Sequence, residues 1–331
     1  MQKLSPVLQE APAIALPVGR YRVFFRPCSP PAASGTVSLS AWRGAFGHAL
    51  KRAVCVTRAP QCTGCLLLLT CSYPYLFETP PPDGAQKMRR YRAAPHPYLF
   101  SGWSEDPELF TLELTLIGRG NQYLPYALHA LDRAGAEGIG SNRKRFQLES
   151  VAQEVALGSE DWQPIYHPQE SCSPLALSTP LPPPAPPGIG VRLLSPLRLK
   201  HEEHLVDPGS FRFADLFGNL LRRISMLTYF HTDTPLETDF AHLMALAHAV
   251  SIAGAELTWQ DWTRYSSRQH TTMEMGGLMG TFRVAATDLA PFWPYLWLGQ
   301  WVHAGKAAVM GNGRYRLEPA ASLPDRTAAL P

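Results

Sequence analysis

The sequence contains few charged residues and no long apolar run. Charged side chains make up 17% of its 331 residues, and the formal net charge is only +3. A charge this small does not by itself indicate a nucleic-acid partner, because such binding needs local basic patches. No segment offers the roughly 18 consecutive apolar residues that a transmembrane helix requires, so we expect no membrane span.

A secretory signal is also missing from the first residues. Pro6, Pro12 and Pro17 interrupt the N-terminus, which lacks the basic and then apolar order of a signal peptide. The sequence therefore predicts a soluble cytoplasmic protein.

Cysteine is scarce, but four of the six residues cluster. Cys55, Cys62, Cys65 and Cys71 occur in CVTRAPQCTGCLLLLTC. In a reducing compartment such clustering favours a metal over disulfides, and the CxxC of Cys62 and Cys65 is typical of a zinc knuckle. The outer spacings are not those of a standard zinc ribbon. Three alternatives stay open: structural zinc, an iron–sulfur cluster, or bare thiols and disulfides.

Proline is abundant, and its distribution divides the chain. Many of the 32 prolines gather in SPLALSTPLPPPAPPGIG, residues 173–190. Because proline lacks an N–H donor and fixes φ, this stretch suits neither a helix nor a central strand. We expect an extended linker at 173–190 between domains of residues 1–172 and 191–331.

The two sides of the linker resemble each other. PYALHALDRAGAEGIGSNRKRFQL begins at Pro125, and PYLWLGQWVHAGKAAVMGNGRYRL begins at Pro294. Each predicts a helix opened by proline, a glycine-rich turn, and a short strand with arginine beside an aromatic ring. We interpret the halves as a duplicated domain.

Earlier elements repeat the same order. Residues 20–27 and 190–200 are strand-like, and each run precedes a helix for which Ser40 or Ser210 is the expected N-cap. Residues 110–118 alternate as a half-buried strand. This order predicts an α+β fold of two tandem ferredoxin-like (RRM-like) domains, with a small cysteine-rich insertion at 55–71 in the first. RRM proteins bind RNA on the sheet of this fold.

Three further sequence motifs are specific enough to indicate a protein family. WVHAGKAAVMGNGRYRL places glycines at 305, 311 and 313, MGGLMGTFRV spans 275–284, and WRGAFGHALKR spans 42–52. The first resembles the C-terminal glycine-rich signature of the RAMP superfamily of CRISPR-associated proteins. The other two resemble a strand and an N-terminal helix of the CRISPR repeat-processing endoribonucleases. The cysteine cluster, which ends in CSYPYLFETP, matches a branch of that family.

The resemblance implies a metal-independent cut in the CRISPR precursor transcript, 3′ of a repeat hairpin, with the neighbouring 2′-hydroxyl as nucleophile. No cofactor is then expected for catalysis, although structural zinc stays open. The expected partners are the hairpin of the CRISPR repeat RNA and other subunits of an interference complex. Proton transfer near neutral pH suits histidine.

Candidate catalytic residues follow from that chemistry. His48 lies on the helix where many family members keep their active-site histidine, and Lys51 shares its helix face. His303, which adjoins the glycine-rich loop at 305–313, is the rival. Tyr21 is the only residue available for the tyrosine often found upstream in the family.

Candidate RNA-binding residues are cations near aromatic rings, which suit phosphates and stacked bases, or members of the glycine-rich loop, whose bare backbone can approach phosphates. They are Arg43, Arg52, Arg89, Arg90, Arg92, Arg143, Lys144, Arg145, Arg268, Gly305, Lys306, Gly311, Gly313 and Arg314. Two other functions stay open: a non-catalytic RAMP subunit that binds or caps guide RNA, and a zinc-stabilised RNA-binding module outside CRISPR biology.

Overall fold

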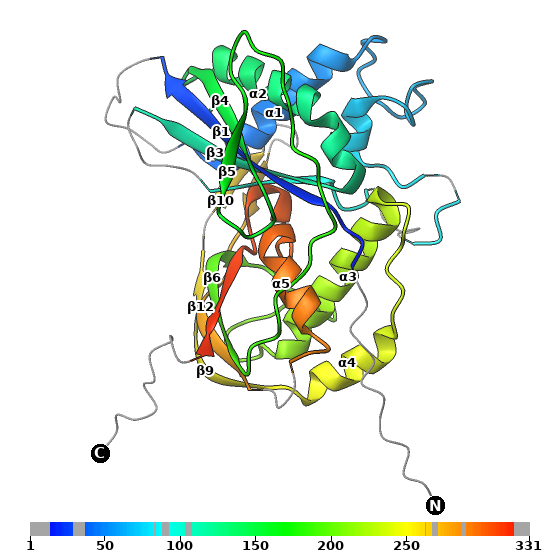
Figure 1. The fold of residues 1–331 in the computed structure, drawn as a ribbon, viewed down its shortest axis with the longest axis vertical. Coiled ribbons are helices and arrows are strands. Elements are labelled where there is room, and N and C mark those ends of the chain that lie inside the picture. The colour runs from blue at the N-terminus through cyan, green and yellow to red at the C-terminus, as the bar shows by residue number, and fades with distance from the viewer. Residues whose placement is uncertain are drawn as a thin grey trace, which may run out of the picture.

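The chain forms two α+β halves, one before and one after the proline-rich segment (Figure 1). The N-terminal half, blue to green in Figure 1, lies above the C-terminal half, yellow-green to red. The predicted α+β class is confirmed. The structure is a computed structural model that describes residues 14–28, 37–82, 84–87, 93–102, 108–261, 263–266, 271–285 and 289–320.

The N-terminal half is a ferredoxin-like domain. Its antiparallel sheet has the strand order β2-β3-β1-β4-β5, in which β5 is an added edge strand. Helices α1 and α2 cover the face of this sheet that is turned away from the C-terminal half (Figure 1). The elements are β1 (Val18–Pro27), α1 (Leu39–Val54), β2 (Tyr98–Ser101), β3 (Phe110–Ile117), α2 (Leu124–Glu137), β4 (Phe146–Glu154) and β5 (Trp162–Tyr166).

The C-terminal half repeats the arrangement. Its sheet order, β13-β6-β12-β9, corresponds to β4-β1-β3-β2 of the first half, so the prediction of two ferredoxin-like domains is confirmed. The elements of the domain are β6 (Ile189–Leu197), α3 (Phe213–His231), β9 (Ser251–Gln260), β12 (Gly277–Ala285), α5 (Trp293–Val302) and β13 (Tyr315–Pro319). Its insertions are β7 (Lys200–His201), β8 (His204–Leu205), α4 (Phe240–Ala249), β10 (Thr263–Ser266) and β11 (Thr271–Glu274).

Three short helical turns complete the list of elements. A π-helical turn spans Pro74–Glu78, and 3-10 turns span Gly118–Tyr123 and Ala308–Met310. The last of these lies inside the glycine-rich loop.

Strand β1 shows how the sequence selects the two faces of the N-terminal sheet. Tyr21, Val23 and Phe25 are at most 1% exposed and pack under the helices. Side chains alternate along a strand, so Arg20 and Arg22 point to the opposite face. That face carries charge and is turned toward the other domain.

Both helix caps differ from the expected residues. Ser40 is already helical, and the N-cap of α1 is Ser38, whose hydroxyl accepts a hydrogen bond within the first turn at 3.2 Å. Ser210 lies outside α3, which begins after Arg212; the Arg212 N–H donates to the Asp215 carboxylate at 2.9 Å. The expectation of Ser40 and Ser210 was wrong because a nearby residue already offered extended backbone and a capping partner.

The proline-rich segment is extended, but it is held at several points. The Leu175 N–H donates to Gln153 Oε1 of β4 at 2.9 Å, and Gln153 Nε2 donates back to the Leu175 carbonyl at 3.2 Å. Farther along, the indole N–H of Trp293 donates to the Pro183 carbonyl at 2.5 Å. The segment therefore contacts both domains along its length.

Besides the proline-rich segment, apolar contacts also join the two domains. Leu16, Leu99 and Ile117 of the N-terminal domain belong to the apolar core built around α3 and α5. All three are 0% exposed, and full burial of such a side chain contributes about 1.5–3 kcal/mol to the stability of the folded state.

None of the helices among the described residues is both long and apolar enough to cross a bilayer.

His231, the last residue of α3, joins the domains through two hydrogen bonds. The Tyr75 hydroxyl lies 3.1 Å from its Nδ1, and its Nε2 lies 2.7 Å from the Pro95 carbonyl oxygen. Since a carbonyl only accepts, Nε2 carries the proton and Nδ1 accepts from Tyr75. Burial lowers the pKa of His231 to about 4, so the folded protein holds this ring neutral.

We expect this histidine to make stability pH-dependent. In the unfolded chain the pKa of this histidine is about 6.5. Between pH 6.5 and pH 4 the unfolded state therefore binds a proton that the folded state does not bind. The stability that the neutral His231 ring contributes to the folded state is complete above pH 6.5 and is lost as the pH falls toward 4. Between pH 7 and pH 5, urea unfolding should show that His231→Asn loses about 2 kcal/mol less stability than the parent.

The matched control is His129→Asn, because His129 is exposed on α2. That variant should lose as much stability on acidification as the parent. An unchanged acid sensitivity in His231→Asn would contradict the assignment.

Candidate functional site

A cavity of about 300 Å³ opens on the outer side of the N-terminal domain. His48, Lys51 and Arg52 line it from α1, and Arg143 lines it from the turn before β4. We call it the helix-face cavity. The structure thus brings together four residues that the sequence singled out in two separate segments.

The geometry of α1 explains why three of these side chains share one face. Residues three and four positions apart lie side by side on a helix. Phe46, Ala49 and Leu50 are at most 1% exposed and pack on the sheet, which turns the intervening residues outward. His48 is exposed, so its imidazole is accessible to a substrate.

Cations outnumber acids around the helix-face cavity. Arg52 forms an ion pair with Glu137 of α2. Lys51 Nζ donates to the Pro60 carbonyl at 2.8 Å. No ion pair joins Arg143 to another residue that the structure describes. Its guanidinium is therefore the group best placed to meet an anion.

Two further predicted cations lie in the same turn as Arg143. Lys144 pairs with Ile139 in a β-bridge, and the Arg145 carbonyl accepts from the Cys28 N–H at 3.0 Å. They extend the basic edge beyond the helix-face cavity. Four other predicted residues lie outside the described residues: Arg89, Arg90, Arg92 and Arg268.

Tyr21 and Arg43 do not line the helix-face cavity. The Tyr21 hydroxyl donates to Asn121 Oδ1 at 3.0 Å, and burial raises the pKa of Tyr21 well above its ordinary value. The Arg43 guanidinium lies 4.5 Å from the centre of the Phe77 ring, and its Nη2 lies 3.4 Å from His96 Nε2. Both side chains point into the protein.

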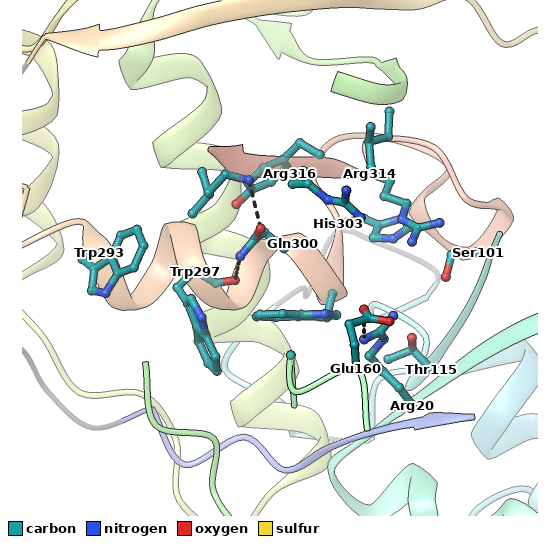
Figure 2. Close-up of a pocket in the computed structure, with 15 residues that line it drawn as sticks. Arg20, Ser101, Thr115, Glu160, Trp293, Trp297, Gln300, His303, Arg314 and Arg316 are labelled. Carbon is teal, nitrogen blue, oxygen red and sulfur yellow. Dashed lines mark hydrogen bonds and ion pairs between the residues drawn. The ribbon is translucent and has the colours of Figure 1, made fainter. Parts of the chain in front are cut away.

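A larger cavity, of about 490 Å³, lies between the two domains (Figure 2). Arg20, Ser101 and Thr115 line it from the N-terminal sheet, and His303 and Arg314 line it from the C-terminal domain. We call it the interdomain cavity. In Figure 2 these polar groups gather at one end, away from Trp293 and Trp297 of α5.

A network of ion pairs fixes the charged end of this cavity. Arg20 Nη1 lies 2.8 Å from Glu154 Oε1, and these side chains are 6% and 1% exposed. Arg314 Nη2 crosses the domain boundary to Glu113 Oε2 at 3.3 Å. Removing one member of a buried pair leaves an uncompensated charge. The guanidinium groups are therefore held in fixed positions.

His303 lies at this end of the interdomain cavity, at the C-cap of α5. It is 1% exposed, and its φ of 58° is unusual for a residue other than glycine. Nδ1 lies 3.2 Å from the Asn312 carbonyl oxygen, so Nδ1 carries the proton. Burial and the nearby Arg314 hold the pKa of His303 well below 6.5. The two candidate histidines thus line different cavities.

The glycine-rich loop packs between the domains. A Cβ on Gly311 would lie 2.5 Å from Leu39 Cδ1 of α1 and 3.2 Å from the Phe100 carbonyl oxygen. One on Gly313 would lie 1.7 Å from the Ala304 carbonyl oxygen. Glycine is required because the Leu39 side chain and neighbouring backbone occupy the space of a side chain, and because both residues have a positive φ.

The start of the same loop is held by α3 and by the residue that follows β6. The Gly305 N–H donates to Asn219 Oδ1 at 2.7 Å, and the Lys306 N–H donates to the Arg198 carbonyl at 2.9 Å. Partial burial and the nearby Lys200 lower the pKa of Lys306. Lys306 therefore belongs to a cationic group that does not line either cavity.

The four clustered cysteines line one small cavity after α1. All are free thiols, so the structure contains no disulfide among them. No three His, Cys, Asp or Glu side chains of the described part of the chain are arranged to hold a metal ion. Structural zinc stays a prediction.

Sequence reasoning missed the aromatic wall of the interdomain cavity. Trp293, Trp297 and Trp301 line it from α5. Their spacing of four residues was a signal, because it places three indoles along one helix face. The acidic partners on the N-terminal sheet carried no local signal, since strands distant in sequence contribute them.

Two family models match the chain. Residues 191–315 match the model described as CRISPR-associated endoribonuclease Cas6, and residues 16–177 match a model described as an N-terminal domain. No curated protein matches the chain significantly.

Solved structures share the fold. A Cas6 product complex has a TM-score of 0.52 and 13% identity, over 91% of this chain and 99% of that chain. A partial Cas6-RT-Cas1–Cas2 complex has a TM-score of 0.54 and 15% identity, over 96% of this chain and 48% of that chain. At such identities the likeness concerns the fold alone.

We expect Arg143 to contribute one phosphate contact. Arg143→Gln should weaken binding of a repeat hairpin and reduce the slope of log affinity against log salt by about 1. Filter binding between low and moderate salt measures this slope. Arg212→Gln, an exposed arginine at the start of α3, is the control and should leave the slope unchanged. An unchanged slope in Arg143→Gln would remove it from the RNA footprint.

The contacts of the glycine-rich loop predict opposite effects for two glycine substitutions. Gly313→Ala should lower the free energy of unfolding by at least about 2 kcal/mol, because of its φ of 70° and the contact with Ala304. Gly44→Ala should raise it by about 0.5–1 kcal/mol, since Gly44 lies within α1 with open space around it. Urea unfolding of both variants tests this pair. Equal effects would contradict the packing described.

Proposed function

The chain belongs to the Cas6 family of CRISPR-associated endoribonucleases, and on this premise we propose that it cuts precursor transcripts within the repeat, 3′ of a hairpin, without a metal ion. Cleavage of RNA in CRISPR processing is the activity of the family. The proposal adds the position of the cut, the chemistry and the residues.

The observation that carries the assignment is the content of the helix-face cavity. It combines an exposed imidazole, His48, with the cations Lys51, Arg52 and Arg143. Cleavage of a phosphodiester needs a group that transfers a proton and a cation that stabilises charge on the phosphate. Of the two cavities described, this one offers an exposed histidine.

The reaction is an internal transfer at phosphorus. The 2′-oxygen of the nucleotide before the cut bonds to the adjacent phosphorus, and the bond from phosphorus to the 5′-oxygen of the next nucleotide breaks. A base removes the proton of the 2′-hydroxyl, and an acid gives a proton to the departing 5′-oxygen. The products are a 2′,3′-cyclic phosphate and a 5′-hydroxyl, so no water, oxidant or metal enters the balance.

We assign the proton removal to His48, since imidazole exchanges a proton near neutral pH. Arg143 would stabilise the phosphate charge, because it is not engaged in an ion pair with any described residue. Arg52 is partly neutralised by Glu137, and Lys51 is directed to the Pro60 carbonyl. These two cations would act mainly through the positive electrostatic potential that they add to the helix-face cavity.

His303 is the weaker catalytic candidate. It is 1% exposed, one ring nitrogen is engaged by Asn312, and its low pKa keeps it from acting as an acid near neutral pH. Its contacts favour a role in holding the glycine-rich loop. Tyr21 and Arg43 have no part in this proposal because both point into the protein.

The proposed partner is the hairpin of a CRISPR repeat. We also propose that the protein binds further CRISPR subunits, because one matched structure is a Cas6-RT-Cas1–Cas2 complex. A subunit that only binds guide RNA is the alternative function. It would use the same basic surface but would leave the transcript intact.

We expect His48→Ala to lower the cleavage rate by about 10²–10⁴-fold with little change in RNA affinity. The assay uses a repeat hairpin in EDTA, single-turnover conditions and detection of the cyclic phosphate. His129→Ala, another exposed helical histidine, is the control and should cut at the parental rate.

The outcomes separate the alternatives. Full activity of His48→Ala would move the assignment to His303. No cutting by the parent protein, with tight hairpin binding, would favour the non-catalytic subunit. Loss of parental activity in EDTA would overturn the metal-independent chemistry.

A further inference from the structure

The short β-hairpin between β6 and α3 carries two histidines directly opposite each other. It consists of β7 and β8, and His201 pairs with His204 across a two-residue turn. Residues that face each other in an antiparallel pair project their side chains to the same side, with Cβ atoms about 4.5–5.5 Å apart. Both histidines are exposed. The hairpin therefore holds two potential metal ligands side by side.

The turn between these histidines has an unfavourable backbone for its residues. Glu202 and Glu203 have φ of 44° and 65°, a region that two-residue hairpin turns usually fill with glycine or asparagine. Left-handed backbone is costly for glutamate, because its Cβ crowds the following carbonyl oxygen. Strands of two residues each offer few contacts that could offset this cost. A ligand that joins the two strands would stabilise the hairpin.

Both imidazole rings are held in the same tautomer. His201 Nδ1 lies 3.1 Å from Asp215 Oδ1, and His204 Nδ1 lies 2.9 Å from the Glu202 carbonyl oxygen. A carboxylate and a carbonyl only accept, so Nδ1 carries the proton in each ring. Within the described part of the chain, neither Nε2 has a hydrogen-bond partner. Two nitrogen lone pairs are thus left to bind an ion.

The contact with Asp215 distinguishes this pair from two ordinary surface histidines. A histidine that binds a metal almost always donates its other ring N–H to an acceptor such as a carboxylate, which orients the ring and raises its basicity. Asp215 is itself fixed, because its side chain is 7% exposed and its Oδ2 accepts from the Arg212 N–H at 2.9 Å. The outer contact of a metal site is therefore already in place.

The two imidazoles line a cavity of about 260 Å³, which we call the hairpin cavity. Three carboxylates also line it, those of Glu202, Asp207 and Asp215, together with one cation, Arg212. This excess of negative charge favours a positive ion. Because no group of three ligating side chains occurs among the described residues, water would complete the coordination of an ion held by the two histidines.

We propose that the hairpin cavity binds one divalent ion of a late first-row transition metal through the Nε2 atoms of His201 and His204, with Asp215 orienting the first ring. Imidazole suits zinc, copper and nickel, whereas magnesium and calcium prefer oxygen ligands. The ion would hold the hairpin in one conformation. The inference does not rest on the proposed function, because no residue of the hairpin cavity lines the helix-face cavity.

Isothermal titration calorimetry of the untagged full chain with Zn²⁺ tests the ligands. His204→Asn should bind one equivalent of Zn²⁺ fewer than the parent. Asp215→Asn should keep that equivalent but bind it about 10–100-fold more weakly, because it changes only the outer contact. His129→Asn, the exposed histidine of α2, is the matched control and should bind Zn²⁺ as the parent does. The clustered cysteines are the same in all four proteins, so they cannot produce a difference.

Amide hydrogen exchange tests the location of the ion. Zn²⁺ should slow exchange in residues 200–205 of the parent, because the ion joins the two strands, and should leave these residues unchanged in His204→Asn. A native circular dichroism spectrum of His204→Asn, expected for an exposed position, shows that the loss concerns the ligand. Equal Zn²⁺ binding by parent and His204→Asn, or no effect of Zn²⁺ on exchange in the parental hairpin, would overturn the site.

Discussion

The ionic contact between the two sheets is the constraint on which the molecule depends. Glu113 of β3 lies 3.4 Å from Arg22 of its own sheet and 3.3 Å from Arg314 of the other domain. Behind it, the buried pair of Arg20 and Glu154 holds the same sheet face. Such charges fit only one docking position, because any other would leave a buried charge without its partner. The domains are therefore fixed in relation to each other.

This docking changes how the fold can meet RNA. An RRM domain offers its open sheet to bases, and the duplicated fold suggested the same use here. In the structure, Leu99 and Ile117 of the N-terminal sheet enter the C-terminal core, so part of that face is already covered. What remains of it is the interdomain cavity of about 490 Å³. The other surface with a cationic cavity is the helical one, around His48.

The glycine-rich loop connects these features. It follows α5, which carries the tryptophans, and it precedes β13, which carries Arg316. Gly311 lets it pass against Leu39 at the start of α1, the same helix that presents His48. A motif that could have been a phosphate-binding loop is thus also the point where the domains pack. The positive φ of Gly311 and Gly313 and their contacts within the protein explain these glycines, whether or not RNA also touches the loop.

Local patterns in the sequence were enough to predict the ferredoxin-like order of elements, the strands at 20–27 and 110–118 and the shared helix face of His48 and Lys51. Each of these depends on residues within a few positions of one another, which periodicity and turn chemistry record directly. The caps at Ser38 and Arg212 were missed because neighbouring residues compete for the same role. Tertiary structure alone decided that Arg143 joins His48, that His303 is separate from it, and that three tryptophans face a charged network. Those relations join segments far apart in the chain, and only the packing of the two domains sets their distances.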